Sequence, residues 1–352
     1  MTTGSPERFL VVRLSSLGDL VHTIPAVAAL RTSFPAARID WVVNERWSPL
    51  VELVTAINEM IPLGRSPRDV FACVRRLRRT RYTCALDLQG RYRSAVLCWL
   101  SGAPRRIGRD RAATREPGAA FFYTDRVVPT GRHIVDMTVD LAVRAGAKPE
   151  AEPRFPMRVP ENELRGLRET LVKEGISGDY VVISPGGGWI SKCWPPDRFG
   201  AIAAALKKRD GLPSVVNIAP EEEDLGREIV RASGLPNLPV VSLPIPALAA
   251  LLAQARLVVA GDTGPLHLAA ALGTRVVGLF GSTDAGRNGP LPRGVVLQNF
   301  SGEPPEYIRG DYVRLNTYSD AMLSLSVEQV LSAVEQELQE SSHGHCSSPV
   351  QR

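Results

Sequence analysis

Short apolar runs rich in β-branched residues alternate with helical patterns along the first half of the chain. FLVVRL (9–14) predicts a strand, and TIPAVAALRTSF (23–34) predicts an amphipathic helix that follows it. The alternation continues through further segments of both kinds: strands at 38–44, 59–63 and 84–89, and helices at 48–57, 70–81 and 94–102. Strand and helix in turn indicate a parallel sheet that helices cover on both faces.

A proline-rich segment separates this half from a second one. Residues 149–162 (PEAEPRFPMRVPEN) carry four prolines in fourteen positions, which favours a stiff, extended linker. The alternation then restarts: a strand and Gly-rich turn at 180–188, strands at 214–220, 240–243, 257–262 and 275–281, and helices at 198–209, 221–234, 246–255, 265–273 and 326–340. The pattern therefore predicts a second α/β unit of the same type.

At 352 residues the chain is longer than one hydrophobic core usually supports, so two domains are expected. We predict an α/β fold with two Rossmann-like domains that bind a ligand in the cleft between them, at the carboxyl ends of the strands. The predicted boundaries are 7–150 for the N-terminal domain, 151–175 for a linker, 176–325 for the C-terminal domain, 326–341 for a final helix and 342–352 for a disordered tail.

Composition narrows the class of protein further. No window approaches ~18 uninterrupted apolar residues, and the start MTTGSPERF lacks the pattern of a secretory signal, so a cytoplasmic protein is expected. The five cysteines form no CxxC motif and do not stand with histidines at metal-ligand spacing. This spacing predicts free thiols in a reducing compartment.

Positive charge is concentrated in one part of the chain. Residues 65–115 contain fourteen arginines against three aspartates, whereas the whole chain has a net charge of only +5. A solvated helix face would account for such a run. Arginine without lysine, however, favours forked contacts with phosphate or carboxylate groups, so we expect an anionic partner there.

The turn after the first predicted strand, SSLGD, ends in a single carboxylate. This is Asp19, and His22 follows three residues later. An acid at such a turn would repel a phosphate ligand. Asp19 is also a common type of helix cap, because its side-chain oxygen accepts a backbone N–H. The residues by themselves leave both capping and acid–base chemistry open for Asp19.

A second strand-to-helix turn, SPGGGWISKCWP (184–195), has features of a phosphate site. Three glycines let backbone N–H groups come close to a ligand, and Lys192 adds a positive charge. The turn has neither the GxxxxGK[ST] spacing of a P-loop nor a GxGxxG dinucleotide fingerprint. Simple turn glycines are the alternative interpretation.

A third turn, AGDTGPLHLAAALG (260–273), places Asp262, Thr263 and Gly264 at the start of a helix. The N-terminus of that helix offers N–H donors and a partial positive charge to a phosphate. His267 lies one turn into the helix. The alternatives are a core position for His267 and capping for Asp262 and Thr263.

Taken together, SSLGDLVHTIPAVAALR, LDLQGRYRSA, ATREPGAAFFY, PGGGWISKCWP and GDTGPLHLAAALGTRVVGLFGSTD resemble the ADP-heptose:lipopolysaccharide heptosyltransferase family, glycosyltransferase family 9. The matches run in order from about residue 9 to residue 290, and DTGxxHLAAALGT followed by LFG is the most specific of them. The resemblance implies a GT-B fold, in which two Rossmann-like domains face each other across a cleft. It also implies that the C-terminal domain holds the sugar nucleotide, the N-terminal domain holds the acceptor, and the final helix returns to the first domain.

The resemblance also implies roles for individual residues. Asp19 matches the family's general base, which takes the proton of the acceptor hydroxyl as the anomeric carbon is attacked with inversion. Lys192 matches a lysine that contacts the donor phosphates, and Glu222 matches a carboxylate on the ribose hydroxyls. The other implied donor residues are Gly187, Gly188, Asp262, Thr263, Gly264 and His267, and the implied acceptor residues are Ser16, Gly18, His22, Arg76, Arg79, Gln89 and Arg115.

The activity implied by the resemblance is transfer of heptose from ADP-L-glycero-D-manno-heptose to the Kdo-bearing inner core of lipopolysaccharide, with no cofactor required. The implied acceptor is an anionic, lipid-linked glycan of the Kdo–lipid A type. The enzyme would meet it by peripheral contact at the cytoplasmic face of the inner membrane. The chain departs from the family at Gly186–Gly188, where polar residues are frequent, and at Met137, where an arginine is familiar.

Two other functions fit the same pattern. One is a related GT-B transferase that uses another nucleotide sugar and another glycan acceptor. The other is a non-catalytic nucleotide-sugar-binding protein. Nucleic acid is not expected as a partner, because aromatic residues make up only 6% of the chain and no RNA-binding motif is present.

Overall fold

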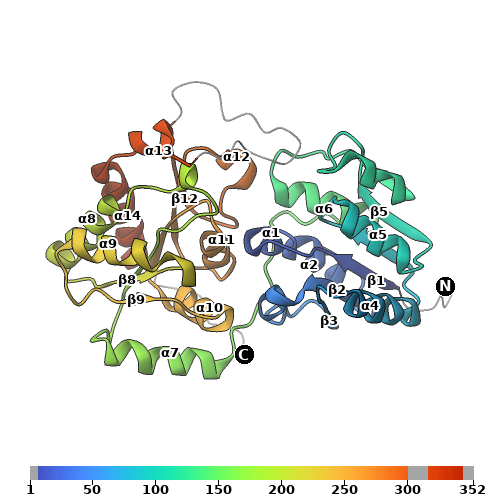
Figure 1. The fold of residues 1–352 in the computed structure, drawn as a ribbon, viewed down its shortest axis with the longest axis horizontal. Coiled ribbons are helices and arrows are strands. Elements are labelled where there is room, and N and C mark those ends of the chain that lie inside the picture. The colour runs from blue at the N-terminus through green and yellow to red at the C-terminus, as the bar shows by residue number, and fades with distance from the viewer. Residues whose placement is uncertain (1–6, 300–315, 344–352) are drawn as a thin grey trace. The chain divides into compact units, whose positions relative to one another are not determined.

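The computed structural model describes residues 7–299 and 316–343, which form two compact units (Figure 1). The body of the first unit runs to Val159, and the body of the second begins at Pro160. Each unit contains its own six-stranded sheet, and the strands of both sheets pair in parallel. The predicted α/β fold with two parallel sheets is confirmed.

The first sheet has the strand order β3-β2-β1-β4-β5-β6. Its strands are β1 (Arg8–Val12), β2 (Arg38–Asn44), β3 (Glu59–Leu63), β4 (Cys84–Asp87), β5 (Arg105–Arg109) and β6 (Asp125–Val127). The helices of this unit are α1 (Leu17–Val21), α2 (Ile24–Ser33), α3 (Ser48–Val51), α4 (Pro67–Thr80), α5 (Tyr92–Leu100) and α6 (Ile134–Arg144), with the 3₁₀ turns η1 (Glu45–Trp47) and η2 (Pro117–Phe122).

Helices pack on both faces of the first sheet. On one face, Leu77 of α4 and Leu97 of α5 share a core cluster with Leu10 of β1. Successive side chains of a strand point to opposite faces, so Phe9 points to the other face. There the Phe9 ring lies 5.1 Å from the ring of Phe34, which directly follows α2, and α2 packs against α6. The apolar residues of β1 that follow Arg8 therefore supply two cores, as a central parallel strand must.

The second sheet has the strand order β12-β11-β10-β7-β8-β9. Its strands are β7 (Val181–Ser184), β8 (Ser214–Asn217), β9 (Val240–Val241), β10 (Leu257–Gly261), β11 (Val276–Phe280) and β12 (Val295–Gln298). The helices that follow in the chain are α7 (Glu161–Lys173), α8 (Pro196–Asp210), α9 (Glu223–Ser233), α10 (Ile245–Gln254), α11 (Gly264–Ala271), α12 (Ala285–Asn288), α13 (Asp320–Ser324) and α14 (Val327–His343), with the 3₁₀ turns η3 (Ile190–Lys192) and η4 (Pro220–Glu222).

Both sheets use the same connection order. Read from β9, the second sheet repeats the order of the first, with β7 in the place of β1 and β10 in the place of β4. In this order the direction of winding reverses between these two strands. Open α/β sheets bind their ligands outside the carboxyl ends of the strands at that switch point. The turns after β1, β4, β7 and β10 are therefore the places to look for a site.

The predicted linker 151–175 is corrected by the structure. Helix α7 occupies Glu161–Lys173, buries Leu167 and Leu171, and packs against α10. The two leucines are one turn apart, so they form a narrow apolar stripe on an otherwise charged helix. Such a stripe is easy to miss beside four prolines, and the connecting segment is shorter than predicted.

The final helix, α14, packs on the second unit. The buried residues Val330, Val334 and Leu338 of α14 belong to the core cluster of the second unit, together with Phe199 of α8. Their spacing of four residues gives α14 one apolar face, and the second unit buries that face. The helix extends to His343, and the remainder of the predicted tail, 344–352, lies outside the described residues.

Cys73, Cys84 and Cys98 are buried free thiols, and Cys193 is a partly exposed one. Within the described ranges, no helix has both the length and the apolar character needed to cross a bilayer.

Candidate active site

Asp19 lies in the first turn of α1, the helix that follows β1 at the switch point of the first sheet. Its Oδ1 forms an ion pair with Nη2 of Arg13 at 2.7 Å, and 31% of the Asp19 side chain is exposed. Its Oδ2 accepts hydrogen bonds from the backbone N–H and the hydroxyl of Ser16, both at 3.2 Å. Asp19 therefore caps the start of α1 and also presents a partly exposed carboxylate.

Arg13 is held firmly in the interior of the first unit. Its side chain is 5% exposed, its Nε donates to the carbonyl of Ser15 at 3.2 Å, and its Nη1 donates to the carbonyl of Leu88 after β4. The backbone carbonyl of Arg13 accepts a hydrogen bond from the indole of Trp41 at 3.1 Å. A guanidinium that is fixed in this way holds the carboxylate of Asp19 in one orientation.

Opposing influences set the protonation state of Asp19. Burial raises the pKa of its carboxyl, but the positive charge of Arg13 lowers it. The N–H of Ser16 and the charges of His22 and Arg115 lower it further, so the pKa of Asp19 lies well below its usual range. Asp19 is therefore ionised at neutral pH, as a proton acceptor must be.

The end of β4 supports the same turn. Gln89 accepts a hydrogen bond from the backbone N–H of Leu14 at 2.9 Å. The buried Asp87 accepts bonds from the N–H groups of Gln89 at 2.9 Å and Gly90 at 3.0 Å, and from the phenol of Tyr123 at 2.6 Å. Burial raises the pKa of Asp87 although these donors oppose the shift. Gln89, an expected acceptor residue, thus also fixes the backbone that leads into the α1 turn.

The other expected residues of this turn differ in their exposure. Ser16 is exposed at the N-cap of α1, and Gly18 is half-buried. His22 is 6% exposed, and its ring meets the ring of His133 edge-on at 5.9 Å. Its carbonyl accepts a bond from the hydroxyl of Thr138 at 3.1 Å. Ser16 and Gly18 therefore border the site, whereas His22 lies in the interior of the unit and acts on the site through its charge.

Arg115 reaches the site from the segment between β5 and β6. A Cβ on Gly90 would lie 3.4 Å from the backbone nitrogen of Arg115, and the N–H of Glu116 donates to the carbonyl of Gly90 at 3.0 Å. Gly90 has a φ of +72°, a conformation that favours glycine, so a side chain there would be strained. The structure thus brings Arg115 beside the turn after β4, close enough for its charge to act on Asp19.

Arg76 and Arg79 lie away from this site. Arg76 on α4 forms an ion pair with Glu59, the first residue of β3, and Glu59 also pairs with Arg38 at the start of β2. Parallel strands begin at the same edge of a sheet, so this network marks the amino ends, whereas Asp19 follows a carboxyl end. Arg79 lies one turn further along α4. The structure does not bring these two arginines together with Asp19. The sequence could not show this, because a run of charged residues does not tell which edge of the sheet each side chain reaches.

The second unit carries a different constellation at its switch point. Lys192 follows the Gly-rich turn after β7, and Asp262 follows β10. Nζ of Lys192 lies 3.0 Å from Oδ2 of Asp262, and Nε2 of His267 lies 3.0 Å from Oδ1 of the same carboxylate. Lys192 also lies over the ring of Trp189, with Nζ 4.5 Å from the ring centre. Asp262 therefore links Lys192 and His267, so three of the expected donor residues are in contact.

The charge of Asp262 is set by its partners. Burial raises the pKa of the Asp262 carboxyl, but the charge of Lys192 and the hydrogen bond and charge of His267 outweigh it. The pKa of Asp262 therefore lies well below its usual range. Asp262 stays a carboxylate and positions the ammonium of Lys192 at the mouth of the Gly-rich turn, where a phosphate group would offer it a second anionic partner.

Glu222 borders the Gly-rich turn. A Cβ on Gly186 would lie 2.3 Å from Oε2 of Glu222, and a Cβ on Gly187 would lie 2.8 Å from Sγ of Cys193. Gly188 is exposed and has no atom within 4 Å of its Cβ position. A side chain at 186 or 187 would therefore displace Glu222 or Cys193, and the structure brings the expected ribose carboxylate to the same turn.

Thr263 and Gly264 open α11. Thr263 is the N-cap of this helix and Gly264 its first residue, and both are partly exposed. The hydroxyl of Thr263 donates to the carbonyl of Gly261 at 3.2 Å and does not cap the helix. The first N–H groups of α11 are therefore available to an anion beside Asp262 and Lys192.

The sequence interpretation missed two residues that shape these sites, Arg13 and Trp189. Arg13 directly follows β1, whose last four residues are apolar, and a buried charge in such a position needs a partner, which was a usable signal. Trp189 stands inside the quoted Gly-rich turn but was not singled out. In the described part of the chain, no group of three or more His, Cys, Asp or Glu side chains is arranged to hold a metal ion.

Two parallel six-stranded sheets of the same order, each with charged side chains at its switch point, are the architecture of the GT-B fold class. Residues 70–304 match glycosyltransferase family 9 (heptosyltransferase). The chain is 33% identical over 304 residues to lipopolysaccharide heptosyltransferase 1 of Pseudomonas aeruginosa, and the match covers 82% of each protein. The chain therefore belongs to glycosyltransferase family 9 and is an enzyme, which confirms the resemblance seen in the sequence.

Solved structures confirm the fold class. The E. coli ADP-heptose lipopolysaccharide heptosyltransferase II is similar with a TM-score of 0.79 at 21% identity, over 95% of this chain and 99% of that one. The E. coli heptosyltransferase WaaC with ADP has a TM-score of 0.75 at 23% identity, over 94% of this chain and 99% of that one.

Proposed function

We propose that this chain is an inverting heptosyltransferase that transfers heptose from ADP-L-glycero-D-manno-heptose to the Kdo-bearing inner core of lipopolysaccharide. The observation that carries the proposal is the pair of unlike charges at the two switch points, the carboxylate of Asp19 and the ammonium of Lys192. Transfer from a sugar nucleotide needs a proton acceptor for the attacking hydroxyl and a positive charge for the leaving diphosphate. One unit supplies each.

The donor binds to the second unit. Lys192, the N–H groups at the start of α11 and those of the Gly-rich turn meet the charge of the diphosphate, so the proposal requires no cofactor. Glu222 accepts hydrogen bonds from the ribose hydroxyls. An adenine nucleotide is supported by the relatives, since the similar solved proteins are named as an ADP-heptose transferase and as a heptosyltransferase with ADP.

The reaction forms one bond and breaks one. The oxygen of the acceptor hydroxyl bonds to the anomeric carbon as the bond from that carbon to the diphosphate oxygen breaks. Asp19 takes the proton of the hydroxyl, and ADP leaves with the bonding electrons. Attack on the face opposite the leaving group inverts the anomeric configuration, and Lys192 stabilises the negative charge that grows on ADP.

The acceptor binds to the first unit. We propose an anionic, lipid-linked glycan of the Kdo–lipid A type, whose carboxylates and phosphates suit the guanidinium of Arg115 beside Gly90. The enzyme reaches this acceptor at the cytoplasmic face of the inner membrane through peripheral contact. Nucleic acid has no place in this proposal.

Product analysis tests the proposal. The protein is incubated with a Kdo–lipid A acceptor that lacks heptose and, in separate reactions, with ADP-heptose, UDP-glucose or GDP-mannose. We expect the acceptor to gain the mass of one heptose with ADP-heptose alone. Transfer of another sugar instead would establish the alternative transferase, and binding of ADP-heptose without any transfer would establish the non-catalytic alternative.

The ion pair between Arg13 and Asp19 leads us to a prediction about how kcat depends on pH. Burial raises the pKa of Asp19, and the positive charge of Arg13 lowers it. Arg13→Met removes this charge, so the pKa of Asp19 rises. The base must be deprotonated to act, so the acidic limb of kcat moves to higher pH. We expect the acidic limb of the kcat profile of Arg13→Met to lie at higher pH than that of the parent.

Arg31→Met is the matched control for this pH profile. Arg31 also holds backbone carbonyls, with Nε donating to Ala56 at 3.0 Å and Nη1 to Ala37 at 2.8 Å, but it does not contact Asp19. Its profile should run parallel to that of the parent. An Arg13→Met profile that is also parallel to the parent would show that Arg13 does not set the pKa of the base.

The close contact between Gly186 and Glu222 leads us to a prediction about KM for the donor. Gly186→Ala places a methyl group where the carboxylate of Glu222 now lies, so Glu222 must move. We expect KM for the donor to rise several-fold, by about 1 kcal/mol, with kcat nearly retained. Gly178→Ala is the control, because nothing lies within 4 Å of its Cβ position. Equal KM values in both variants would remove Glu222 from the donor site.

A further inference from the structure

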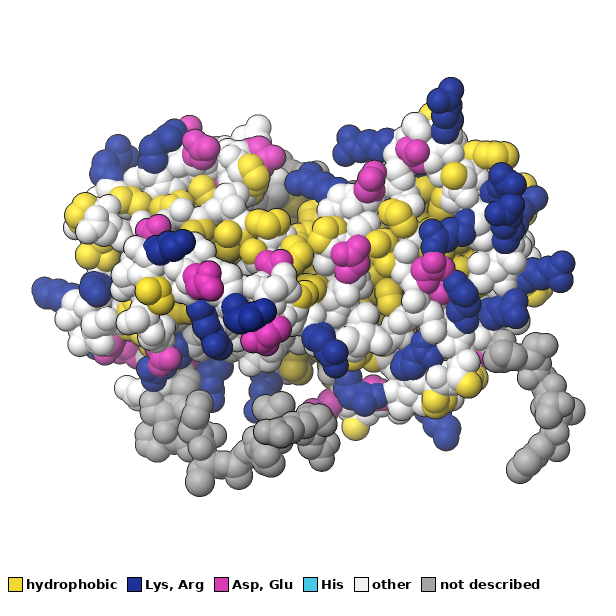
Figure 2. Space-filling view, turned by 90° about the horizontal axis from the view of Figure 1, so that it is seen from below, with side chains coloured by type: hydrophobic (Ala, Val, Ile, Leu, Met, Phe, Trp, Pro, Cys, Tyr) yellow, Lys and Arg dark blue, Asp and Glu magenta, His cyan; other side chains and the backbone are white. Residues whose placement is uncertain are grey.

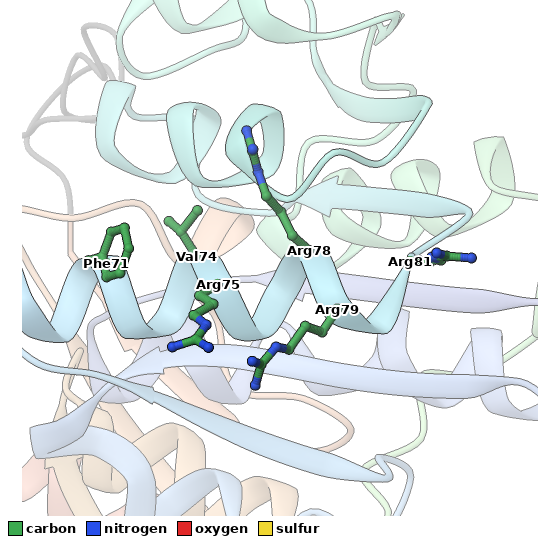
Figure 3. Close-up of a pocket in the computed structure, with 6 residues that line it drawn as sticks. All are labelled: Phe71, Val74, Arg75, Arg78, Arg79 and Arg81. Carbon is green, nitrogen blue, oxygen red and sulfur yellow. The ribbon is translucent and has the colours of Figure 1, made fainter.

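The outer face of α4 carries an aromatic side chain among arginines. Phe71 is 71% exposed, and Arg75 and Arg79 follow it at spacings of four residues, so the three share one face of the helix. Together with three neighbours they line an open groove of about 670 Å³ (Figure 3). The neighbours are Val74, Arg78 and Arg81.

Two more exposed aromatic side chains lie on α5, which packs against α4, and on η2, which packs against α5. Trp99 is 52% exposed and Phe121 is 82% exposed, and the ring of Phe122 lies 6.2 Å from the first and 5.8 Å from the second. Arg78 links the two helices, because its Nε donates to the carbonyl of Leu100 at 2.9 Å. We refer to the following set as the arginine–aromatic face: Phe71, Arg75, Arg78, Arg79, Trp99 and Phe121.

The charge of this face is not neutralised within the described residues. None of Arg75, Arg78 and Arg79 forms an ion pair with a carboxylate there, whereas the adjacent Arg76 pairs with Glu59. Figure 2 shows arginine and lysine side chains crowded over the right-hand part of the molecule, with hydrophobic side chains visible between them. A single exposed apolar residue needs no explanation, but grouped aromatic side chains among unneutralised guanidiniums mark an interaction surface.

We propose that the arginine–aromatic face binds an anionic lipid bilayer. Guanidinium groups are attracted to phosphate headgroups at the membrane surface, and exposed Trp and Phe side chains insert at the boundary between headgroups and acyl chains. The groove is lined by Phe, Val and Arg only, without the amide and hydroxyl groups that proteins use on nucleic acid, so a bilayer fits it better.

This inference rests on the proposed function in one respect, since a lipid-linked acceptor requires the enzyme to work at a bilayer. It also gives the arginines of α4 a role that the site of Asp19 does not. They hold the enzyme at the membrane that carries the acceptor, and they do not contact the glycan.

Vesicle co-sedimentation of the full-length protein tests the charge of the face. We expect binding to phosphatidylglycerol–phosphatidylethanolamine vesicles at about 0.1 M salt, and at least about tenfold weaker binding at about 1 M salt. Arg75→Gln/Arg79→Gln should lower the affinity by about tenfold or more at the lower salt concentration. The matched control Lys207→Gln/Lys208→Gln removes two exposed charges from α8 and should bind as the parent does.

A second variant tests the aromatic side chains. Phe71→Ser/Phe121→Ser removes two highly exposed rings, which the fold does not need, and should weaken vesicle binding by about tenfold. If both double variants bind vesicles like the parent, the inference is wrong. It is also wrong if the parent prefers single-stranded RNA to anionic vesicles and the aromatic variant changes neither affinity.

Transfer to a deacylated, water-soluble acceptor separates this inference from the proposed function. Both double variants should transfer heptose to that acceptor at the parent's rate, because the face touches only the bilayer. Loss of that transfer together with vesicle binding would assign the face to the glycan and overturn the inference. Absence of transfer in the parent itself would overturn the proposed function and leave the vesicle results unaffected.

Discussion

Asp19→Asn is expected to lower kcat by about 10²–10⁴-fold, on the order of 3–5 kcal/mol of transition-state stabilisation, with little change in the affinity for ADP. The amide oxygen of Asn can still accept the N–H of Ser16, so the cap of α1 survives. The amide cannot take a proton from the acceptor hydroxyl. Steady-state turnover gives kcat, and titration calorimetry gives the ADP affinity.

A control at α4 separates capping from catalysis. Asp69 has the same position in a capping box, with its Oδ2 accepting the N–H of Ser66 at 3.0 Å. Asp69→Asn therefore changes a cap of the same kind outside the site, and it should leave kcat unchanged.

A second comparison separates catalysis from the ion pair. Asp19→Asn removes the counter-charge of the buried Arg13, so some loss of stability is expected. Arg13→Met breaks the same pair but keeps the base, so it should retain most of its turnover near about pH 8, where Asp19→Asn should not. If Asp19→Asn turns over within a few-fold of the parent, the Asp19 carboxylate is a structural partner of Arg13 and the base lies elsewhere.

Lys192→Ala is expected to weaken ADP binding by about ten- to a hundredfold, the value of one charge-assisted contact of about 1.5–3 kcal/mol. Two effects add. The diphosphate loses its ammonium partner, and the carboxylate of Asp262 is left with His267 alone, close to the incoming negative charge. Calorimetry with ADP measures the loss, and thermal unfolding reports how far the uncompensated carboxylate destabilises the unit.

Two further variants show whether Lys192 acts locally. Lys207→Ala removes an exposed lysine of α8 and should bind ADP like the parent. Lys192→Ala/Asp262→Asn removes the repulsive carboxylate as well, so it should bind ADP more tightly than Lys192→Ala does. Unchanged ADP affinity in Lys192→Ala would move the donor site away from the Gly-rich turn.

Much of the fold could be predicted from the sequence because central parallel strands are continuous apolar runs. The central strand β10 (Leu257–Gly261) was predicted as 257–262, one residue beyond its observed end. β2 (Arg38–Asn44) and the edge strand β3 (Glu59–Leu63) were predicted at their observed bounds. β5 reads RRIGR and β6 reads DRV, so their charged residues hide the strand pattern, and both were missed. β6 lies at an edge of its sheet, where a strand is buried on fewer sides and tolerates charge.

The turns of the site could be predicted, but their internal contacts could not. Asp19, Lys192 and Asp262 each follow a recognisable strand, and the switch-point rule places such turns at a ligand. The partnership of Asp19 with Arg13 depends on how Leu88 presents its carbonyl from the turn after β4, which no local pattern encodes.

The central claim is a division of labour, in which the first unit holds the base and the second unit holds the nucleotide. The most direct test is the ADP affinity of the parent, Asp19→Asn and Lys192→Ala, measured side by side by titration calorimetry. We predict that Asp19→Asn binds ADP like the parent and that Lys192→Ala binds it at least about tenfold more weakly. An equal loss of ADP affinity in both variants, or no loss in either, would contradict this division.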